Sequence, residues 1–591
     1  MAALKTELMN ENKRRKYELL RAQLEIERAT FLDHWRDLGK HGNARRMRFA
    51  VSDVNKGDRR NKDIIDNTAV TSLRTLRSGM MAGVTSPARP WFRLTTPDPQ
   101  LNNVSSVKLW LDQVTNILTG VFLKSNLYNV LPLIYGDMGQ FATSALMIEE
   151  DFEDVVRYYA FPIGTYFIAV NEKGKVDTFV RDFRMTVKQV VNKFGRTKRE
   201  DPKFIDWSNI SLMVQNLYEN DQRESWVDLV HVILPNDEYD GKKLESKFKK
   251  YKSVYYERGS VGGQTYDYMQ GDDSVKILSE KGYDFFPVLC PRWEVSAEDA
   301  YGTSCPGMDA IGDIKQLQLG EKRTMQAVDK IVNPPMTAPT SMRNSKTSLL
   351  PGDVSYVDLR DGQQGFKPVH EVRLSISEIS MKQDQCRKRI QDAYFTNLFL
   401  MFANDDRLQP ATATEVDEKK QEKLLALGPV LEQLNQDLLD PNIDITFDIA
   451  HRQGLIPPAP KEMHGMELRV EYLSIMAQAQ KVAGISGIER FTQFVVNNSE
   501  AFPAMKDKVD VDALADVYGD MTSVPPQVIR SDDQVAQIRQ AQAKVQQQQM
   551  QQQAAQQQSQ TVKNLSQADT SGNNALSQLM NQSQAGQLAP Q

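Results

Sequence analysis

The sequence predicts an α+β fold that is mainly helical. Apolar residues recur at steps of three and four over long stretches in both halves of the chain, as in amphipathic helices. Between about residues 145 and 290, runs rich in Val, Ile, Phe and Tyr are bounded by turn residues, which predicts strands. At 591 residues the chain is too long for one ordinary core, so we expect several domains or subdomains.

Three helices are expected before the strands. Residues 4–38 are typical of one long charged helix, and residues 65–80 carry an apolar stripe that stops at Gly83. A third helix is expected over residues 106–131. The basic cluster at residues 13–16 could touch a phosphate, but a solvated helix face is the favoured interpretation.

The strands are expected in the middle of the chain, with one short helix over residues 187–194 that stops at Gly195. The segments with strand composition are 145–148, 166–170, 176–183, 227–234, 251–257 and 275–278. Residues 172–174 are typical of a hairpin turn. The acidic run at residues 149–154 is interpreted as a solvated turn rather than a metal or acid–base site.

Two long helices that bracket a turn-rich segment are the main architectural signal. Residues 308–332 have helical spacing, and Pro334 and Pro335 end this helix. The following segment is dense in Pro, Ser, Thr and Gly, with a strand expected at 354–359, and the chain is helical again over 371–402. The first helix would be about 35–40 Å long. We therefore expect an excursion that runs out and back, with a small cap at its tip.

The last third is expected to be helical, then Gln-rich. A loop at 404–411 leads to a helix that opens with a capping box at residues 412–415 and is kinked at Gly428 and Pro429. A linker at 457–460 precedes helices expected over 468–482 and 488–496. From residue 524 the chain is rich in Gln, Ala and Ser. Disorder and a helical extension ordered only by neighbouring copies both remain open for this tail.

Charge and composition narrow the classes of function. The net charge is −5, with 72 Lys and Arg against 77 Asp and Glu, so any contact with DNA is expected to be weak, local or transient. Three scattered cysteines and six scattered histidines predict neither a disulfide framework nor a metal centre, and no cofactor is expected. No apolar run is long enough to predict a membrane span, and residues 1–16 lack the apolar core of a secretory signal.

Motifs for catalysis are missing from the sequence. It contains no phosphate loop of the form G-x-x-x-x-G-K-[ST], no G-x-S-x-G elbow and no H-E-x-x-H pair. Gly259, Gly262 and Gly263 lie close together but lack the Lys and the helix that a phosphate loop needs. We therefore assign no catalytic residue and expect that the protein is not an enzyme.

Several blocks resemble the portal, or head-to-tail connector, proteins of podovirus-type bacteriophages, over roughly residues 36–480. The blocks follow the family's order: Ile65-Asp66-Asn67-Thr68-Ala69 through Met80-Met81, Ser86-Pro87-Ala88-Arg89-Pro90-Trp91-Phe92, Tyr135-Gly136-Asp137 with Ile148-Glu149-Glu150, Pro306-Gly307-Met308-Asp309-Ala310 with Gly312-Asp313-Ile314-Lys315, and Thr412-Ala413-Thr414-Glu415-Val416. The first block is long enough to be specific, whereas Thr-Ala-Thr-Glu alone would not be.

The resemblance implies a ring of about twelve copies, with parts that the family calls wing, stem, clip and crown. In this chain they would be the wing at 1–305, the first stem helix at 306–332, the clip at 333–369, the second stem helix at 370–402, a channel loop, kinked wing helix and linker at 403–466, the crown at 467–525 and the Gln-rich tail at 526–591. The resemblance thus implies a portal-type fold.

The same resemblance implies which residues carry the function. The stem residues expected at the channel or at a subunit interface are Asp309, Asp313, Lys315, Glu321, Lys322 and Arg323. Asp405, Asp406 and Arg407 would lie on the loop that projects toward DNA. Val354, Tyr356 and Val357 in the clip would contact the packaging motor and later the tail adaptor, through a strand shared between subunits or an intrachain hairpin.

The implied function is a channel at one vertex of the capsid, through which double-stranded DNA is packaged and ejected. The implied partners are other copies of the chain, DNA in transit, the major capsid and scaffolding proteins, the terminase large subunit and a tail adaptor, with no membrane. The protein would assemble in the host cytoplasm and end in the virion. Another virion ring, such as a tail adaptor or an ejected internal protein, and an enzyme of the packaging machine are the alternatives.

Overall fold

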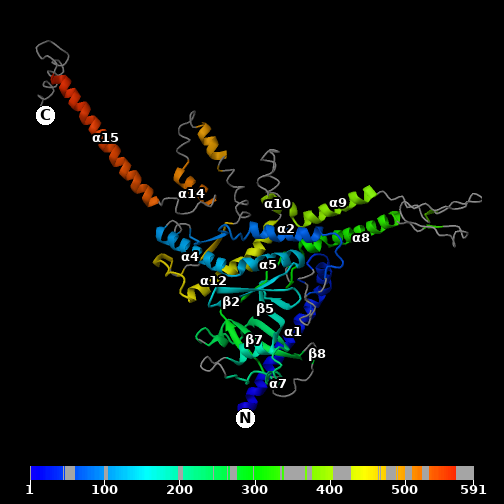
Figure 1. Ribbon diagram of the computed structural model, residues 1–591. Coiled ribbons are helices and arrows are strands. Elements are labelled where there is room, and N and C mark those ends of the chain that lie inside the picture. The colour runs from blue at the N-terminus through cyan, green and yellow to red at the C-terminus, as the bar shows by residue number, and fades with distance from the viewer. Residues whose placement is uncertain are drawn as a thin grey trace, which may run out of the picture. The chain divides into compact units, whose positions relative to one another are not determined.

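A computed structural model gives the fold of the chain (Figure 1). It describes residues 2–43, 46, 49, 57, 60–98, 101, 104–196, 204–243, 245–261, 264–265, 276–296, 299–332, 336–337, 367–368, 376–403, 427–463, 465, 468–473, 488, 490–498, 509–521 and 532–566. The chain divides into two compact units, Met1–Pro97 with Trp110–Lys506, and Asp98–Leu109 with Asp507–Gln591.

Helices and strands both contribute, as the α+β prediction requires. The helices are α1 (Ala2–His41), α2 (Thr68–Gly83), α4 (Ser105–Lys124), α5 (Leu127–Phe141), α6 (Val187–Val190), α7 (Leu212–Glu219), α8 (Pro306–Val332), α9 (Ile376–Ala393), α10 (Thr396–Ala403), α12 (Asp440–Arg452), α14 (Val511–Met521) and α15 (Asp532–Ser566). The strands are β1 (Phe92–Thr95), β2 (Ala145–Asp151), β3 (Val155–Phe161), β4 (Tyr166–Val170), β5 (Val176–Thr186), β6 (Trp226–Pro235), β7 (Tyr251–Val261), β8 (Gln264–Thr265), β9 (Ser279–Tyr283), β10 (Val288–Leu289), β11 (Met336–Thr337), β12 (Lys367–Pro368) and β13 (Arg469–Tyr472).

The main sheet is antiparallel and runs in the order β4-β5-β6-β7-β8, with β9 paired to β7. Its strands are apolar on both faces, because α1 covers one face and further core residues cover the other. Val230 and Val232 on β6 face Tyr17 and Leu24 of α1, whereas the alternate residue Ile233 belongs to the core on the opposite side. This alternation follows from the two-residue period of a strand.

Three arginines, seven residues apart along α1, are buried against the main sheet. Arg21 makes two hydrogen bonds to the Asp182 carboxylate, at 2.8 and 2.6 Å. Arg14 donates to the Glu257 carbonyl at 2.7 Å. Arg28 donates to a main-chain carbonyl and lies 4.0 Å from the centre of the Phe167 ring. The interpretation of residues 13–16 as a solvated face is therefore wrong for Arg14, which is buried, whereas Arg15 and Lys16 are exposed as expected.

A second sheet, in the order β10-β2-β3, packs with the far end of α1. Trp35 is fully buried there, and its ring lies 5.6 Å from that of Phe31 and 5.3 Å from that of Tyr301. The acidic run at the end of β2 forms the turn into β3. Asp151 accepts hydrogen bonds from the main-chain N–H groups of Glu153 and Asp154. The turn prediction is therefore confirmed for residues 152–154, whereas residues 149–151 belong to strand β2.

Two predicted helices are broken in the structure. The helix expected over 106–131 is α4 and α5, with a bend of 78° between them. Asn126 causes the break, because its side-chain amide pairs with both main-chain groups of Tyr158 on β3. The helix expected over 371–402 is α9 and α10, separated at Phe395, whose φ of 53° lies in the left-handed region.

Two other predicted segments differ in type or place. The helix expected over 468–482 begins as strand β13, which pairs antiparallel with β1 and is fixed by the Arg93–Glu471 ion pair at 2.6 Å. The strand expected over 275–278 is displaced to β9, because Ser279 to Tyr283 pair with β7. Strand β3 was not predicted. In each of these three cases the structure depends on pairing with a distant segment, and the local composition carries no information about that pairing.

Three predicted helices and one predicted turn are confirmed within the described residues. Helices α1, α2 and α8 agree with the predicted segments, as does the hairpin turn at Gly174, whose φ is 71°. In the smaller unit, α15 takes up 532–566 of the Gln-rich tail as one helix. Among the described helices, none alone is long and apolar enough to cross a membrane, and α4 and α5 pass that test only together, across their bend.

Candidate functional site: the α8–α9 helix pair

Helices α8 and α9 lie side by side and run in opposite directions (Figure 1). Asp313 on α8 accepts hydrogen bonds from Arg389 on α9 at 2.9 and 2.6 Å. About three turns farther along α8 from the α5 end, Gln383 donates to Thr324 at 3.0 Å. Gly320 faces the same glutamine, so the two helices approach closely there. The contacts fix an antiparallel register along most of α9.

The first turn of α8 is anchored on the end of α5. Pro306 opens the helix, where a missing N–H costs nothing. A Cβ on Gly307 would lie 2.7 Å from the Gln140 carbonyl oxygen, so this position requires glycine. Ala310, Ile314 and Leu317 then bury one side of α8. The helix is therefore held firmly at its beginning and reaches outward from there.

Asp66, just before α2, joins three elements at this site. Its carboxylate accepts a hydrogen bond from Arg387 of α9 at 3.0 Å and one from the Thr68 N–H at 2.7 Å. The Gln318 side chain of α8 bonds to the main chain of Ile65 and Asp66. Burial raises the pKa of Asp66, but the hydrogen bonds from Thr68 and Arg387 outweigh it, so the pKa lies below its ordinary value. Asp66 is thus held as a carboxylate.

The structure places the six predicted residues of α8 in different surroundings. Asp313 and Glu321 pair with Arg389 and Arg387 of α9, the latter at 2.5 Å, and Lys315 pairs with Asp37 of α1. These three have partners within their own chain. Asp309, Lys322 and Arg323 are exposed. Burial and the nearby Glu294 raise the pKa of Asp309, against a hydrogen bond from Ser304.

Exposed apolar side chains on the same helices were missed by the sequence analysis. Leu319 is 48% exposed, Met325 61%, and Val332 76%. On α9, Met381 is 65% exposed. The apolar spacing of Met325, Val328 and Val332 indicated a helix but not its environment, because a buried stripe and a surface that another protein covers have the same pattern. Large apolar groups exposed in one region are typical of contact surfaces.

The segment between α8 and α9 begins and ends at one place. β11 and β12 pair antiparallel, with Met336 opposite Pro368 and Thr337 opposite Lys367. The two ends of this segment are therefore held together by the pairing of β11 with β12. The predicted contact residues Val354, Tyr356 and Val357 lie outside the described residues, as do Asp405, Asp406 and Arg407.

The described residues offer no metal site, since no three His, Cys, Asp or Glu side chains among them gather closely enough to hold an ion. The three cysteines are buried and unpaired. Burial raises the pKa of Cys305 to about 12, and that of Cys290 higher still, so neither thiol is poised as a nucleophile.

Comparison with known proteins gives near full-length matches. The family model described as bacteriophage head to tail connecting protein matches residues 14–529. A protein of Salmonella phage epsilon15 named "Portal protein" is 44% identical over 567 residues, which cover 96% of this chain and 98% of that protein. A protein of Bordetella phage BPP-1 named "Probable portal protein" is 39% identical over 569 residues, with the same coverage.

Proposed function

The chain belongs to the family of bacteriophage head to tail connecting proteins, and from this we propose that it is the portal of a phage capsid. About twelve copies form a ring at one capsid vertex, and double-stranded DNA passes through the ring during packaging and ejection. The terminase large subunit docks on the ring first and a tail adaptor later, while the major capsid and scaffolding proteins surround it. The ring assembles in the host cytoplasm and remains in the virion. It has no catalytic role.

The observation that carries the proposal is 44% identity, over nearly the whole of both chains, to a protein named as a portal. The α8–α9 pair supports it independently. Residues 306–332 serve as the first stem helix, 333–369 as the clip and 370–402 as the second stem helix. The wing occupies residues 1–305, the crown 467–525, and the tail after 525 extends the crown.

Neighbouring copies cover the exposed apolar side chains of the stem. An isolated chain leaves Leu319, Met325 and Met381 in water, which costs roughly 25 cal/mol for each Å² of apolar surface. A closed ring buries this apolar surface without any other protein, because one side of each copy packs against the opposite side of the next copy. Lys322 and Arg323 then lie at the channel or at its subunit contacts.

The channel works by low adhesion to DNA. Each copy carries a formal charge of −5, so the ring as a whole is acidic. Every Lys or Arg that binds a phosphate adds a salt-dependent affinity that opposes sliding. In the stem, Lys315, Arg387 and Arg389 pair with carboxylates of their own chain, which withdraws these three cations from a passing duplex.

Purified full-length protein tests the ring directly. We expect native mass spectrometry to give a species of about twelve chains, and negative-stain images to show a wide flange with a central hole. We also expect no ATP hydrolysis by the isolated ring. A protein that stays monomeric under all assembly conditions, or hydrolyses ATP unaided, would contradict the proposal. A ring without the flange and stem would favour a tail adaptor instead.

The loop with Asp405, Asp406 and Arg407 projects into the channel and contacts DNA. We expect Arg407→Ala to shorten the packaged genome or to weaken its retention, because the mutation removes the cation of the loop. Pulsed-field electrophoresis of DNA from mutant particles measures the length. Lys461→Ala, a lysine outside the loop, is the control. Packaged length and retention equal to wild type would remove this loop from the mechanism.

A further inference from the structure

The region around α2 is basic although the whole chain is acidic. Residues 40–62 contain eight Lys and Arg against two Asp, namely Lys40, Arg45, Arg46, Arg48, Lys56, Arg59, Arg60 and Lys62 against Asp53 and Asp58. Helix α2 itself carries Arg74 and Arg77 and has no acidic residue. The segment that precedes α2 is thus rich in basic residues, although the net charge of the whole chain is −5 and Asp63 and Asp66 follow it.

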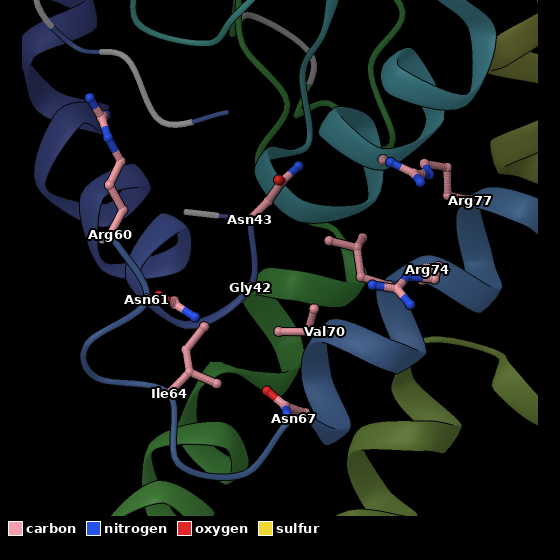
Figure 2. A pocket seen from close by; sticks show the side chains of 11 residues that line it. Gly42, Asn43, Arg60, Asn61, Ile64, Asn67, Val70, Arg74 and Arg77 are labelled. Carbon is pink, nitrogen blue, oxygen red and sulfur yellow. The ribbon is translucent and has the colours of Figure 1, made fainter. Parts of the chain in front are cut away.

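A cavity of about 390 Å³ lies at the centre of this region, and we call it the α2 pocket. Figure 2 shows Arg74 and Arg77 on α2 at one side of the pocket, with Arg60 and Asn61 on the other. Asn43 and Asn67 add side-chain amides. The residues that line the pocket include no Asp or Glu. Its polar groups are therefore mainly hydrogen-bond donors and positive charges.

Carboxylates close to the α2 pocket are engaged by other cations. Asp137 is buried and pairs with Arg46, with a distance of 3.0 Å from Nε to Oδ2. Asp66 pairs with Arg387. Within the described part of the chain, Arg74 and Arg77 form no ion pair, but the positive charge of Arg77 lies near the buried Asp137 carboxyl and opposes the rise that burial causes in the pKa of Asp137. Arg74 is therefore available to an external anion, and Arg77 shares its charge with Asp137.

The geometry favours a phosphate on an extended chain. Arg74 is exposed and lies one turn before Arg77, so both reach the same side of the helix. From Asn67 to Arg77 the helix rises about 15 Å. One strand of B-DNA carries about four phosphates over that distance. Guanidinium forks and amide N–H groups are donors that phosphate oxygens accept.

We propose that the α2 pocket binds phosphodiester groups of the DNA backbone through Arg74 and Arg77. The assignment rests on the proposed portal function, which brings duplex DNA to the ring. It adds a defined point of contact to a channel that otherwise adheres weakly. The contact is independent of base sequence, because it involves phosphates alone.

The test measures binding of a fluorescent duplex to the assembled ring by anisotropy over a range of salt concentrations. Each lost phosphate contact lowers the slope of log K against log salt by about 0.9, which corresponds to about eightfold in affinity at 0.1 M salt. For each copy that touches the duplex, we expect Arg74→Gln to lose one such contact and Arg74→Gln/Arg77→Gln to lose two. The single variant keeps Arg77, which packs against Gly136, so the fold at that point is unchanged.

The double variant Arg196→Gln/Arg223→Gln is the matched control, because both arginines are exposed and lie far along the chain from α2. An equal loss of affinity in this control, or an unchanged salt slope in both α2 variants, would overturn the assignment. Titration with inorganic phosphate alone distinguishes a site for small anions. If phosphate binding depends on Arg74 while the α2 variants bind the duplex as tightly as the wild type does, the proposal is also refuted. If the wild-type protein forms no ring or binds no duplex, the portal function fails instead.

Discussion

Arg14, Arg21 and Arg28 fix the packing of α1 on the main sheet, although the sequence alone predicts only that they belong to a charged helix. Their seven-residue spacing puts them on one face, because two helical turns cover about seven residues. Each finds an acceptor far away in sequence, such as Asp182 for Arg21. Burial lowers the pKa of Arg28, but its guanidinium donates to the Gly164 carbonyl, so the desolvated cation is partly satisfied.

His231 on β6 is a second buried polar residue with consequences for stability. Its ring stacks on Tyr255, with centroids 3.8 Å apart, and its Nε2 lies 2.9 Å from Ser253 Oγ. Burial lowers the pKa of His231 well below its ordinary value, and the Arg181 and Lys193 cations lower it further. The folded protein therefore holds this histidine neutral.

Because the unfolded chain takes up the proton first, we predict that stability falls as the pH drops below about 6.5. The full contribution of the neutral histidine is present above that pH. The loss approaches about 1.4 kcal/mol for each pH unit until the folded form also protonates. His231→Gln cannot titrate, so its unfolding midpoint should depend less on pH between 7 and 5 than that of the wild type. Thermal unfolding at fixed protein concentration measures this.

Ser253→Ala is the control for that experiment, because it removes the hydrogen bond and keeps the histidine. Its midpoint should be lower at every pH, with the wild-type dependence on pH retained. The same pH dependence in wild type and His231→Gln would show that other groups account for the acid sensitivity.

At the scale of elements, two of the three glycines in helix α8 have opposite roles. Gly307 lies against the Gln140 main chain, where a Cβ would be 2.7 Å from the carbonyl oxygen. Gly312, less than two turns later, has nothing within 4 Å of such an atom. One glycine permits close packing, and the other only weakens the helix, by up to about 1 kcal/mol relative to alanine.

We predict opposite effects for alanine at these two positions. Gly307→Ala should lower the free energy of unfolding by about 1–3 kcal/mol, since α8 must move away from α5. Gly312→Ala should raise it by up to about 1 kcal/mol. Thermal unfolding of the two variants, compared with wild type, gives both signs. Destabilisation by Gly312→Ala would mean that a neighbouring copy occupies the space beside it, and native mass spectrometry would reveal the altered ring.

Breaks within elements follow a similar logic. The apolar stripe of residues 106–131 is continuous across the junction of α4 and α5, so periodicity alone predicts one helix. Asn126 ends α4 because the Tyr158 main chain offers two hydrogen bonds to its amide. That partner lies on β3, thirty-two residues later, and the strand itself was not predicted. Tertiary contacts thus override a local signal that was otherwise correct.

For the whole molecule, charge is distributed unevenly in a way that serves the proposed function. The acidic total disfavours tight binding of DNA along the channel. The contacts with DNA proposed for each copy are confined to two zones, the α2 pocket and the loop that carries Arg407. The Gln-rich helix α15 carries few charges and no continuous apolar face. Within the smaller unit, its Arg539 forms an ion pair with Asp512 of α14 at 2.6 Å.

The sequence by itself determined the α+β class, the long first helix, the two helices of the out-and-back excursion and the family, because each depends on local periodicity or on many short matching blocks. Only the tertiary structure decided that Arg14 is buried, that Asp313 and Glu321 pair with α9, that Leu319 and Met325 stay exposed and that a donor-lined pocket forms beside α2. These features depend on which distant segments meet. Burial and pairing depend on two surfaces that meet, whereas the residue pattern of one segment describes only one of those two surfaces.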